Sequence, residues 1–252
     1  MDLMLTGKKA LVTGASVGLG RTMARLLAQE GCRLAVVARR EQLLFDLANE
    51  IEAQGCERPL VIVCDITQHD APIRIRAQLD QGFGAPDILI NNAGGSRPFD
   101  GLGTPAQWND AMDLNFHAGR ELAHAFLPDM QARGFGRIIN LTGTDEPLAM
   151  NGGVPPNGAV HLWAKALSRV VGAQGITVNC IAPGRLHSEQ IDTKLLPTPQ
   201  AQRDWVAANC PVGYVGEPAD LGVLVCFLAS PLARYITGQV INVDGGARRA
   251  AS

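Results

Sequence analysis

Residues 13–20 read Thr-Gly-Ala-Ser-Val-Gly-Leu-Gly, and the position of this glycine-rich stretch decides the fold. The apolar run Lys9–Val12 precedes it, and Arg21–Glu30 follows with apolar residues at helical spacing. Backbone N–H groups at the start of a helix point toward an anion, and the helix dipole favours negative charge there. The strand–turn–helix order therefore predicts a site for the pyrophosphate of a nucleotide.

Three glycines of this stretch have separate tasks in such a turn. Gly14 permits a sharp change of direction, Gly18 permits the backbone to approach a phosphate, and Gly20 permits the helix to pack closely on the strand. Glycine-rich turns also occur without a ligand, but the place of this one at the first strand-to-helix junction favours a nucleotide-binding domain.

The composition is that of an ordinary globular domain. The 252 residues are 46% hydrophobic and 18% charged, and the formal net charge is −2. This length suffices for one large domain with a buried core. Because the basic residues are dispersed along the chain, we expect no nucleic-acid partner.

Neither the N-terminus nor the cysteines indicate export. Met1–Gly7 is too short and too acidic for a signal peptide, and no apolar stretch reaches the length of a membrane span. The six cysteines show no Cys-x-x-Cys pairing and lie mostly among apolar residues, at positions 32, 56, 64, 180, 210 and 226. We therefore expect a cytoplasmic protein with free thiols, no disulfides, no metal site and no membrane partner.

Strand-like runs alternate with amphipathic stretches along the chain. The expected strands are Lys9–Val12, Arg33–Ala38, Leu60–Cys64, Asp87–Asn91, Arg137–Thr142, Thr177–Ala182 and Gln239–Val243. Helical periodicity also marks Glu41–Ala53, Trp108–Met130, Asn157–Ala173 and Ala219–Ala229. The alternation predicts an α/β fold: a single Rossmann-type, doubly wound domain over residues 1–252, with about seven parallel strands and helices on both faces.

Two segments interrupt the alternation. Asp145–Pro156 is rich in Gly and Pro, and Arg185–Pro211 contains several prolines. Both follow strands, so both should lie over the carboxyl edge of the sheet, where ligands bind in such folds. We expect residues 185–211 to form a loop that shapes the substrate pocket.

The end of the second expected strand favours NADP over NAD. An acidic side chain there binds the ribose hydroxyls of NAD, whereas a basic one suits the 2′-phosphate of NADP. The sequence has Ala38 in place of an acid, followed by the planar donor fork of Arg39. Alternatively, Arg39 and Arg40 are solvated residues at the start of a helix.

Further motifs follow the later strands in a fixed order. They are Asp65-Ile66-Thr67, Asn91-Asn92-Ala93-Gly94, Asn115 within a helix, Pro183-Gly184, and the ending Tyr235–Gly246. Together with residues 13–20, they resemble the short-chain dehydrogenase/reductase family over nearly the whole chain. The resemblance implies an oxidoreductase that binds a nicotinamide cofactor, acts on a small molecule and forms a homodimer or homotetramer.

The resemblance also implies the cofactor contacts. In that family the glycine-rich turn holds the pyrophosphate, the next two motifs contact the adenine and line the ribose, and a hydroxyl after Pro-Gly holds the nicotinamide amide. The corresponding residues, with the arginine discussed above, are Gly14, Ser16, Gly18, Leu19, Gly20, Arg39, Asp65, Ile66, Asn91, Ala93, Gly94, Pro183, Gly184 and Ser188. Singly, each also has a structural interpretation as a turn glycine, helix cap or loop contact.

The Tyr-x-x-x-Lys pair that gives this family its proton transfer is not found at its usual place. The only tyrosines are Tyr214 and Tyr235, and both lie far from the fifth expected helix. His161 and Lys165 have the internal spacing of a substituted pair. However, Lys165 lies 10 residues before Gly175, whereas the family leaves about 18 residues, roughly five helical turns.

Counting back from the sixth strand places other residues at the catalytic positions. Asn157 takes the place of the lysine and Gly153 that of the tyrosine. His161 then falls one turn further along the helix, where helices of this family often pack against a partner subunit, and we expect a packing or solvent-exposed role for it rather than a catalytic one. Without a phenol and an ammonium, the family's usual carbonyl reduction should be severely weakened, because a positioned general acid contributes about 10²–10⁴-fold.

Several residues are candidates to replace the lost groups. Gly143 occupies the position of the family's serine, so a hydroxyl must come from Thr142 or Thr144, and Asn115 matches the family's asparagine. Asp145 and Glu146, after the fifth strand, can act as acid or base if burial raises the pKa of the carboxyl group. Further candidates are His117 and His187 for proton transfer, and Arg97 and Arg185 for a carboxylate or phosphate of the substrate.

The sequence thus predicts an NADP(H)-binding oxidoreductase with a non-standard active site and an unidentified carbonyl or alcohol substrate. Two alternatives remain open. One is non-redox chemistry on the same scaffold, by a lyase, dehydratase or isomerase. The other is a catalytically silent cofactor-binding subunit.

Overall fold

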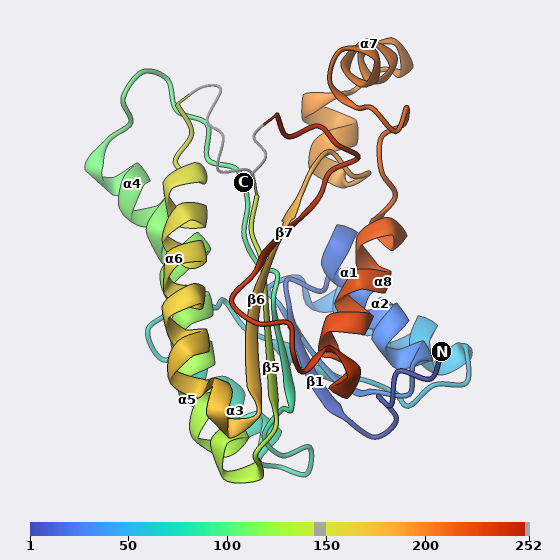
Figure 1. The fold of residues 1–252 in the computed structure, drawn as a ribbon, viewed down its shortest axis with the longest axis vertical. Helices are drawn as coiled ribbons and strands as arrows, with labels where there is room; N and C mark the ends of the chain where they lie inside the picture. Colours follow the sequence, from blue (N-terminus) through green and yellow to red (C-terminus); the bar gives the residue numbers. More distant parts are fainter. Residues whose placement is uncertain (144–149, 250–252) are drawn as a thin grey trace.

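The computed structural model describes residues 1–143 and 150–249. Seven parallel strands form one sheet in the order β3-β2-β1-β4-β5-β6-β7 (Figure 1). The strands are β1 Lys9–Thr13, β2 Arg33–Ala38, β3 Leu60–Val63, β4 Ile88–Asn91, β5 Gly136–Leu141, β6 Ile176–Pro183 and β7 Val240–Val243. The predicted doubly wound fold is confirmed, and each strand agrees with its expected range to within one residue at either end.

Eight α-helices surround the sheet (Figure 1). They are α1 Gly18–Gln29, α2 Glu41–Ala53, α3 Ala71–Leu79, α4 Pro105–Met112, α5 Ala118–Arg133, α6 Val154–Val171, α7 Pro199–Asn209 and α8 Pro218–Ala229. The helices α1, α2 and α8 cover one face, and α3, α5 and α6 cover the other. The strand order reverses between β1 and β4, the place where such sheets bind ligands.

Most strand residues are apolar because helices cover both faces of the central part of the sheet. Val36 and Ile90 pack on the side of α1, α2 and α8. Their sequence neighbours Val37 and Leu89 pack on the side of α3, α5 and α6. Successive side chains point to opposite faces of a strand, so a continuous apolar run supplies both layers.

Two expected segments differ from the structure. The stretch predicted as one helix, Trp108–Met130, is divided by a π-helical segment, η1 (Asp113–His117), between α4 and α5. Residues 185–211 are not an irregular loop, because they contain a second π-helical segment, η3 (Ile191–Leu195), and the regular helix α7. Thr198 begins α7, since its hydroxyl accepts a hydrogen bond from the N–H of Ala201.

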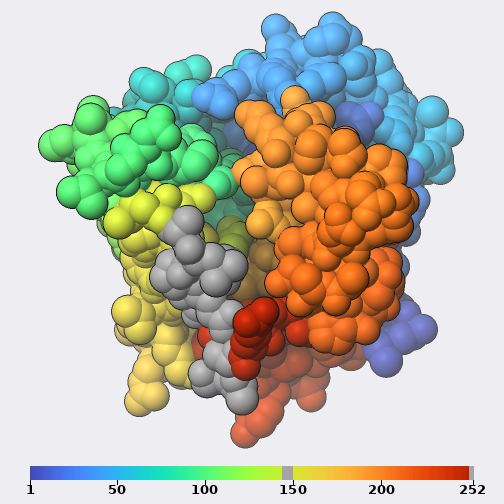
Figure 2. Space-filling model, turned by 90° about the horizontal axis from the view of Figure 1, so that it is seen from above, coloured from blue at the N-terminus to red at the C-terminus, as the bar shows by residue number. Residues whose placement is uncertain are grey.

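The carboxyl ends of the strands face a hollow in the surface. Viewed from above, α4 with η1 and the segment that carries η3 and α7 lie on opposite sides of it (Figure 2). None of the helices within the described ranges is long and apolar enough to span a bilayer. Over the same ranges, no group of three or more His, Cys, Asp or Glu residues is arranged to hold a metal ion.

Candidate functional site

The glycine-rich turn joins β1 to α1 as expected, and its geometry excludes larger side chains. Gly14 has φ +66°, and a Cβ built on it would lie 2.8 Å from Nδ2 of Asn92 and 2.9 Å from Cα of Ala93. A Cβ on Gly20 would collide with the carbonyl group of Gly14. The backbone of this turn is therefore bare at the N-terminus of α1, as the approach of a pyrophosphate requires.

Two residues that the sequence analysis did not select hold this turn in place. Nδ2 of Asn92 donates hydrogen bonds to the carbonyl oxygens of Thr13 (3.0 Å) and Gly14 (3.2 Å). The hydroxyl of Thr13 accepts from the N–H groups of Asn92 (3.0 Å) and Ala93 (3.1 Å). The motif that follows β4 thus fixes the motif that follows β1. Asn92 directly follows Asn91, which was the expected cofactor contact. The spacing of the motif alone does not tell which of the two asparagines holds the turn.

The segment after β6 approaches the same turn. A Cβ on Gly18 would lie 3.8 Å from Cβ of Ser188, whose hydroxyl accepts a hydrogen bond from the N–H of Ile191. Gly184 packs so closely on β7 that a Cβ there would lie 2.7 Å from Cα of Asp244. The glycine-rich turn, which includes Ser16 and Leu19, therefore lies next to the segment Pro183–Ser188, although the turn and the segment are far apart in the sequence.

Arg39 and Asp65 meet at the ends of β2 and β3. Nη1 of Arg39 lies 3.7 Å from Oδ2 of Asp65, and the arginine side chain is 76% exposed. Burial opposes ionisation of Asp65, but hydrogen bonds from the N–H and hydroxyl of Thr67, together with Arg39, lower the pKa of this carboxyl group below its usual value. Ile66, between Asp65 and Thr67 in the sequence, is buried.

Arg40, which the sequence analysis treated as a solvated residue, links two parts of the site. Its Nε donates to Oγ of Ser16 in the glycine-rich turn, at 3.4 Å. Its Nη1 lies 3.4 Å from Oε2 of Glu189, in the segment after β6. Two arginines, Arg39 and Arg40, therefore lie at the end of β2, each close to a carboxylate.

The amide of Asn91, a proposed ribose contact, is directed into the structure. Its Nδ2 donates to the carbonyl oxygen of Gly119 (3.1 Å) and to Oδ1 of Asn140 (2.9 Å). Its buried Oδ1 has no hydrogen-bond partner within the described ranges. Asn91 therefore links β4, β5 and α5, which agrees with the structural interpretation of this residue.

Asn115 lies in the middle of η1 and holds the segment after β4. Its Nδ2 donates to the carbonyl oxygen of Ala111, at 3.0 Å, and its Oδ1 accepts from the N–H of Gly95, at 2.8 Å. A Cβ on Gly94 would lie 3.0 Å from the same Oδ1. π-Helical turns often occur at functional sites, and this one directs a polar side chain toward the carboxyl edge.

Thr142, directly after β5, contacts a histidine on α6. Its Oγ1 lies 2.9 Å from Nε2 of His161 and 3.1 Å from the carbonyl oxygen of Ile181. His161 is part-buried, and its ring reaches the end of β5 through this contact within the chain. Thr142 and His161 form a polar pair that the sequence analysis did not recognise, because the two lie 19 residues apart.

Asn157 and Gly143 also meet at this edge. A Cβ on Gly143 would lie 2.8 Å from Nδ2 of Asn157. The helix α6 begins at Val154 and contains no tyrosine. Gly153 immediately precedes it and is buried.

Lys165 and the two tyrosines lie away from the end of β5. Nζ of Lys165 donates to the carbonyl oxygen of Gly238 at 3.2 Å, at the exposed side of α6. Tyr235 is 99% exposed and Tyr214 is 50% exposed. Three further candidates, Thr144, Asp145 and Glu146, lie outside the described residues.

The remaining histidine candidates have other neighbours. Nδ1 of His187 lies 2.7 Å from Oδ1 of Asp192, within the segment that follows β6. The His117 ring packs edge-on against Phe116, with centroids 5.1 Å apart. The histidine that contacts Thr142 at the end of β5 is His161.

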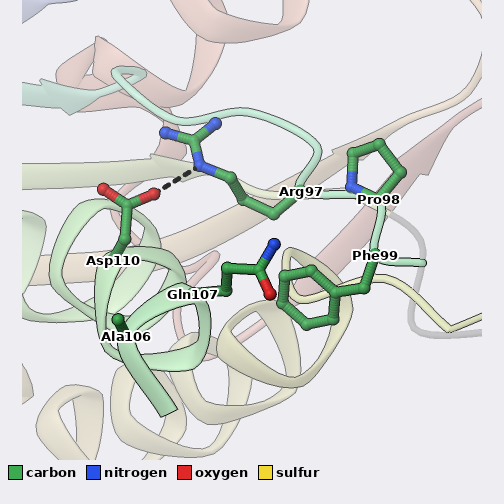
Figure 3. A pocket seen from close by; sticks show the side chains of 6 residues that line it. All are labelled: Arg97, Pro98, Phe99, Ala106, Gln107 and Asp110. Atoms are coloured by element: carbon green, nitrogen blue, oxygen red, sulfur yellow. Dashed lines mark hydrogen bonds and ion pairs between the residues drawn. The ribbon is translucent and has the colours of Figure 1, made fainter. Parts of the chain in front are cut away.

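The two arginine candidates lie on opposite sides of the hollow. Arg97 lines a pocket with Gln107 and Asp110, and its Nε donates to Oδ2 of Asp110 at 2.8 Å (Figure 3). Arg185 lies over the ring of Trp205 in α7, 6.0 Å from its centroid, and burial lowers the pKa of its guanidinium. Polar and cationic groups thus face this region from both flanks.

The residues present fit a nicotinamide dinucleotide. The glycine-rich turn leaves free backbone at a helix N-terminus, two arginines lie where the adenosine ribose binds in such folds, and Ser188 lies beside the turn. The cofactor, when bound, supplies or accepts a hydride. The chain must then supply or accept the accompanying proton.

Comparison with known proteins agrees with this arrangement. A family model described as "Enoyl-(Acyl carrier protein) reductase" matches residues 14–248. The chain is 34% identical to gluconate 5-dehydrogenase of Gluconobacter oxydans over 247 residues, covering 96% of this chain and 95% of the relative. It is 35% identical to the L-tagatose-forming galactitol 2-dehydrogenase of Cereibacter sphaeroides over 248 residues, with the same coverages.

Solved structures with the same fold include nicotinamide-dependent reductases. L-sorbose reductase from Gluconobacter frateurii, complexed with NADPH and L-sorbose, superposes with a TM-score of 0.94 at 27% identity, over 99% of this chain and 100% of the other. A putative gluconate dehydrogenase from Agrobacterium tumefaciens has a TM-score of 0.92 at 28% identity, over 99% of both chains. The chain therefore belongs to the short-chain dehydrogenase/reductase family of oxidoreductases.

Proposed function

We propose that the protein is an NADP(H)-dependent oxidoreductase that interconverts an alcohol and a carbonyl compound. The observation that carries this proposal is the cradle after β1, where a Cβ on Gly14 or Gly20 would collide with neighbouring atoms. Such close packing keeps the backbone of the turn free for a pyrophosphate. The free N-terminus of α1 adds the favourable end of a helix dipole.

The preference for NADP(H) over NAD(H) rests on the arginines at the end of β2. Ala38 leaves no acidic side chain to bind two ribose hydroxyls, and Arg39 and Arg40 offer forked donors for a 2′-phosphate. The L-sorbose reductase structure was solved with NADPH. A second structural relative, a putative NAD(P)-dependent gluconate 5-dehydrogenase from Beutenbergia cavernae, carries NADP.

We propose a small polyhydroxylated substrate, such as a sugar alcohol, a ketose or a sugar acid. The pocket beside α4 is lined by the apolar residues Pro98, Phe99 and Ala106 and by Arg97, Gln107 and Asp110, and the polar atoms of the last three can bind hydroxyl groups (Figure 3). Relatives named above act on gluconate, galactitol and L-sorbose, whereas others are 3-oxoacyl-[acyl-carrier-protein] reductases, including that of Vibrio cholerae at 34% identity. The segment 185–211, on the other side of the hollow, completes the proposed pocket.

The active site in this proposal is non-standard. The helix α6 contains no tyrosine, and its Lys165 is bound to Gly238. Asn115, Thr142 and Asn157 remain near the carboxyl edge to orient a substrate oxygen. Thr144, Asp145 and Glu146 stay candidates for acid–base roles.

The test combines cofactor binding with a substrate panel. NADPH is titrated into the protein and its fluorescence followed, with NADH as the comparison. Absorbance at the nicotinamide band is then followed with ketoses, sugar acids, polyols and 3-oxoacyl thioesters. We expect tighter binding of NADPH than NADH and turnover of a hydroxylated substrate. Binding of NADPH without hydride transfer to any of these compounds would contradict the proposal.

A second candidate is non-redox chemistry on the same scaffold. It is favoured by the absence of tyrosine from α6, since elimination or isomerisation does not need the family's phenol. Its signature would be substrate turnover, detected by mass spectrometry or NMR, with no net change in nicotinamide absorbance.

We also propose that the protein is cytoplasmic and forms a homodimer or homotetramer. Two exposed apolar residues of α6, Leu162 and Val170, contribute to the proposed interface. Light scattering measures the mass of the oligomer and so tests this proposal.

A further inference from the structure

We propose that Thr142 and His161 form the proton relay of this active site, in place of the family's tyrosine and lysine. In this proposal Thr142 exchanges a proton with the substrate oxygen, and His161 exchanges it with Thr142. The inference rests on the proposed oxidoreductase function and deepens it by naming the groups that move the proton.

The position of Thr142 suits this role. It is the first residue after β5, in the central part of the sheet and on the edge where the strands end. Its N–H donates to the carbonyl oxygen of Ile181 at 2.9 Å, and its Oγ1 lies 3.1 Å from the same oxygen. The neighbouring strand β6 therefore holds both the backbone and the hydroxyl group of Thr142.

The contact with His161 gives the hydroxyl group a titratable neighbour. The Thr142 hydroxyl has one proton: at rest it is donated to the carbonyl oxygen of Ile181, and in the proposed relay it turns to the substrate oxygen while Oγ1 accepts from Nε2–H of His161, 2.9 Å away. A hydroxyl both donates and accepts, so it can pass a proton on without becoming charged itself. Histidine is the side chain best suited to supply that proton near neutral pH.

The amide of Asn157 lies close to the backbone of Gly143, next to Thr142. The next residue is Gly143, which has no side chain, and Nδ2 of Asn157 lies 2.8 Å from where a Cβ would be. Asn157 can thus donate a hydrogen bond to the oxygen of a bound substrate. Asn115 lies on η1, which packs against the same helix α6.

Each proton transfer in the proposed relay breaks one bond to hydrogen and forms another. As the carbonyl carbon gains a hydride from the nicotinamide, the C=O double bond becomes a single bond and its oxygen takes the proton of Thr142. The O–H bond of Thr142 breaks while Oγ1 takes the proton from Nε2 of His161. His161 then recovers a proton from solvent, and alcohol oxidation runs the same sequence in reverse.

A purely structural contact between α6 and β5 is the competing interpretation, and H161Q separates the two. The glutamine amide can still donate a hydrogen bond to Thr142, but it has no titratable proton. The relay predicts that kcat falls by about 10²–10³-fold, while the dissociation constant of NADPH stays within a factor of two. A structural contact predicts a kcat close to that of the wild type.

Thr142 is tested with a pair of variants. T142V keeps the shape and removes the hydroxyl group, so we expect the same loss of kcat as in H161Q. T142S keeps the hydroxyl and should remain within about fivefold of the wild type. In H161A, added imidazole should restore part of the lost rate. The exposed His69 supplies the matched control, because H69A removes an imidazole outside this site.

A measurement independent of turnover is ¹⁵N NMR of histidine-labelled protein without cofactor. We expect the His161 resonances to change in T142V and to stay close to the wild type in T142S. Thermal unfolding verifies that each variant is folded. If H161A or T142V does not fold, the relay is judged from the kcat values of H161Q and T142S.

The outcomes are distinct. Wild-type kcat in H161Q overturns the relay, as do equal losses in T142S and T142V, or His161 resonances that T142V leaves unchanged. If wild-type protein binds NADPH but transfers no hydride to any compound of the panel, the proposed function fails, and the relay fails with it. An active wild type with inactive, folded H161Q and T142V supports both.

Discussion

Arg40, at the end of β2, contacts Glu189, in the segment after β6, with 3.4 Å between Nη1 and Oε2. Nε of the same guanidinium donates to Oγ of Ser16 in the glycine-rich turn. One side chain therefore joins the glycine-rich turn to the segment that we propose to shape the substrate pocket. A cofactor phosphate would compete with Glu189 for Arg40.

This competition predicts that E189Q binds NADPH more tightly. Removing the carboxylate frees Arg40 and removes a negative charge near the proposed 2′-phosphate site. Because both side chains are largely exposed, the gain should be modest, about two- to fivefold in the dissociation constant. Titration with NADPH and NADH measures it. Affinity for NADH should stay constant, and an equal change for both cofactors would show that Glu189 does not face the phosphate.

Arg39→Ala is predicted to weaken NADPH selectively. A hydrogen bond to a charged group contributes about 1.5–3 kcal/mol, so the dissociation constant of NADPH should rise roughly 10- to 150-fold. NADH, which lacks the 2′-phosphate, should bind within about twofold of wild type. Arg74→Ala is the control, since that arginine pairs with Asp70 at the start of α3. Parallel loss of both cofactors would disprove the role assigned to Arg39.

Two glycine-to-alanine changes form a matched pair. In G20A the new methyl group collides with the carbonyl of Gly14, and overpacking of this kind costs about 1–3 kcal/mol. Among the described residues, no atom from outside the helix backbone lies within 4 Å of the Cβ position of Gly158, inside α6, so G158A should be neutral or stabilise the helix by about 0.5–1 kcal/mol. Urea unfolding measures both, and NADPH titration should show loss of binding in G20A only. If G20A still binds NADPH, close packing of the glycine-rich turn is not needed for cofactor binding, and the main argument for this site is lost.

The strands and the place of the glycine-rich turn between β1 and α1 could be predicted from the sequence because they depend on neighbouring residues. Apolar runs define β1 to β7, and the glycines of the first turn have fixed spacing. The interruption by η1 could not be predicted, since the periodicity of 108–130 continues through it. It depends on Asn115, whose amide bonds both Ala111 and Gly95.

The pairing of Thr142 with His161 could not be predicted for a related reason. Counting back from the sixth strand predicted which residues stand at the positions of the family's catalytic pair, but it gave no rotation of the helix relative to β5. That rotation places His161 toward the sheet and Lys165 toward Gly238. Long-range contacts between side chains of this kind follow only from the packed structure.

The cysteines should differ in reactivity. Burial raises the pKa of the thiols of Cys32, Cys180 and Cys226 to about 12. The thiolate is the reactive form, so these three should stay unmodified at pH 8 and react only as the pH approaches 12 or the protein unfolds. Cys56 is half-buried and should react first. Mass spectrometry after brief alkylation identifies the modified residue, and rapid labelling of Cys180 in the folded protein would contradict the burial argument.

Arg137, in β5, is the largest fully buried side chain, and R137M should destabilise the fold. Its Nε donates to the carbonyl oxygen of Ser230 and its Nη1 to those of Gly136 and Gly175, at 2.8–3.1 Å. Burial lowers the pKa of this guanidinium to about 10, so the charge has a desolvation cost that these carbonyl groups offset.

Methionine fills much of the same volume without a charge, but it leaves buried carbonyl oxygens without donors. Each such oxygen costs about 1–3 kcal/mol, which exceeds the gain from removing a buried charge that is already well solvated by the protein. We expect R137M to lower the free energy of unfolding in urea by about 2–4 kcal/mol, while R203M, on the exposed side of α7, changes it by less than about 0.5 kcal/mol. Equal stability of R137M and wild type would mean that the carbonyl groups find other donors, and that the buried guanidinium is not needed to join β5 to the ends of α6 and α8.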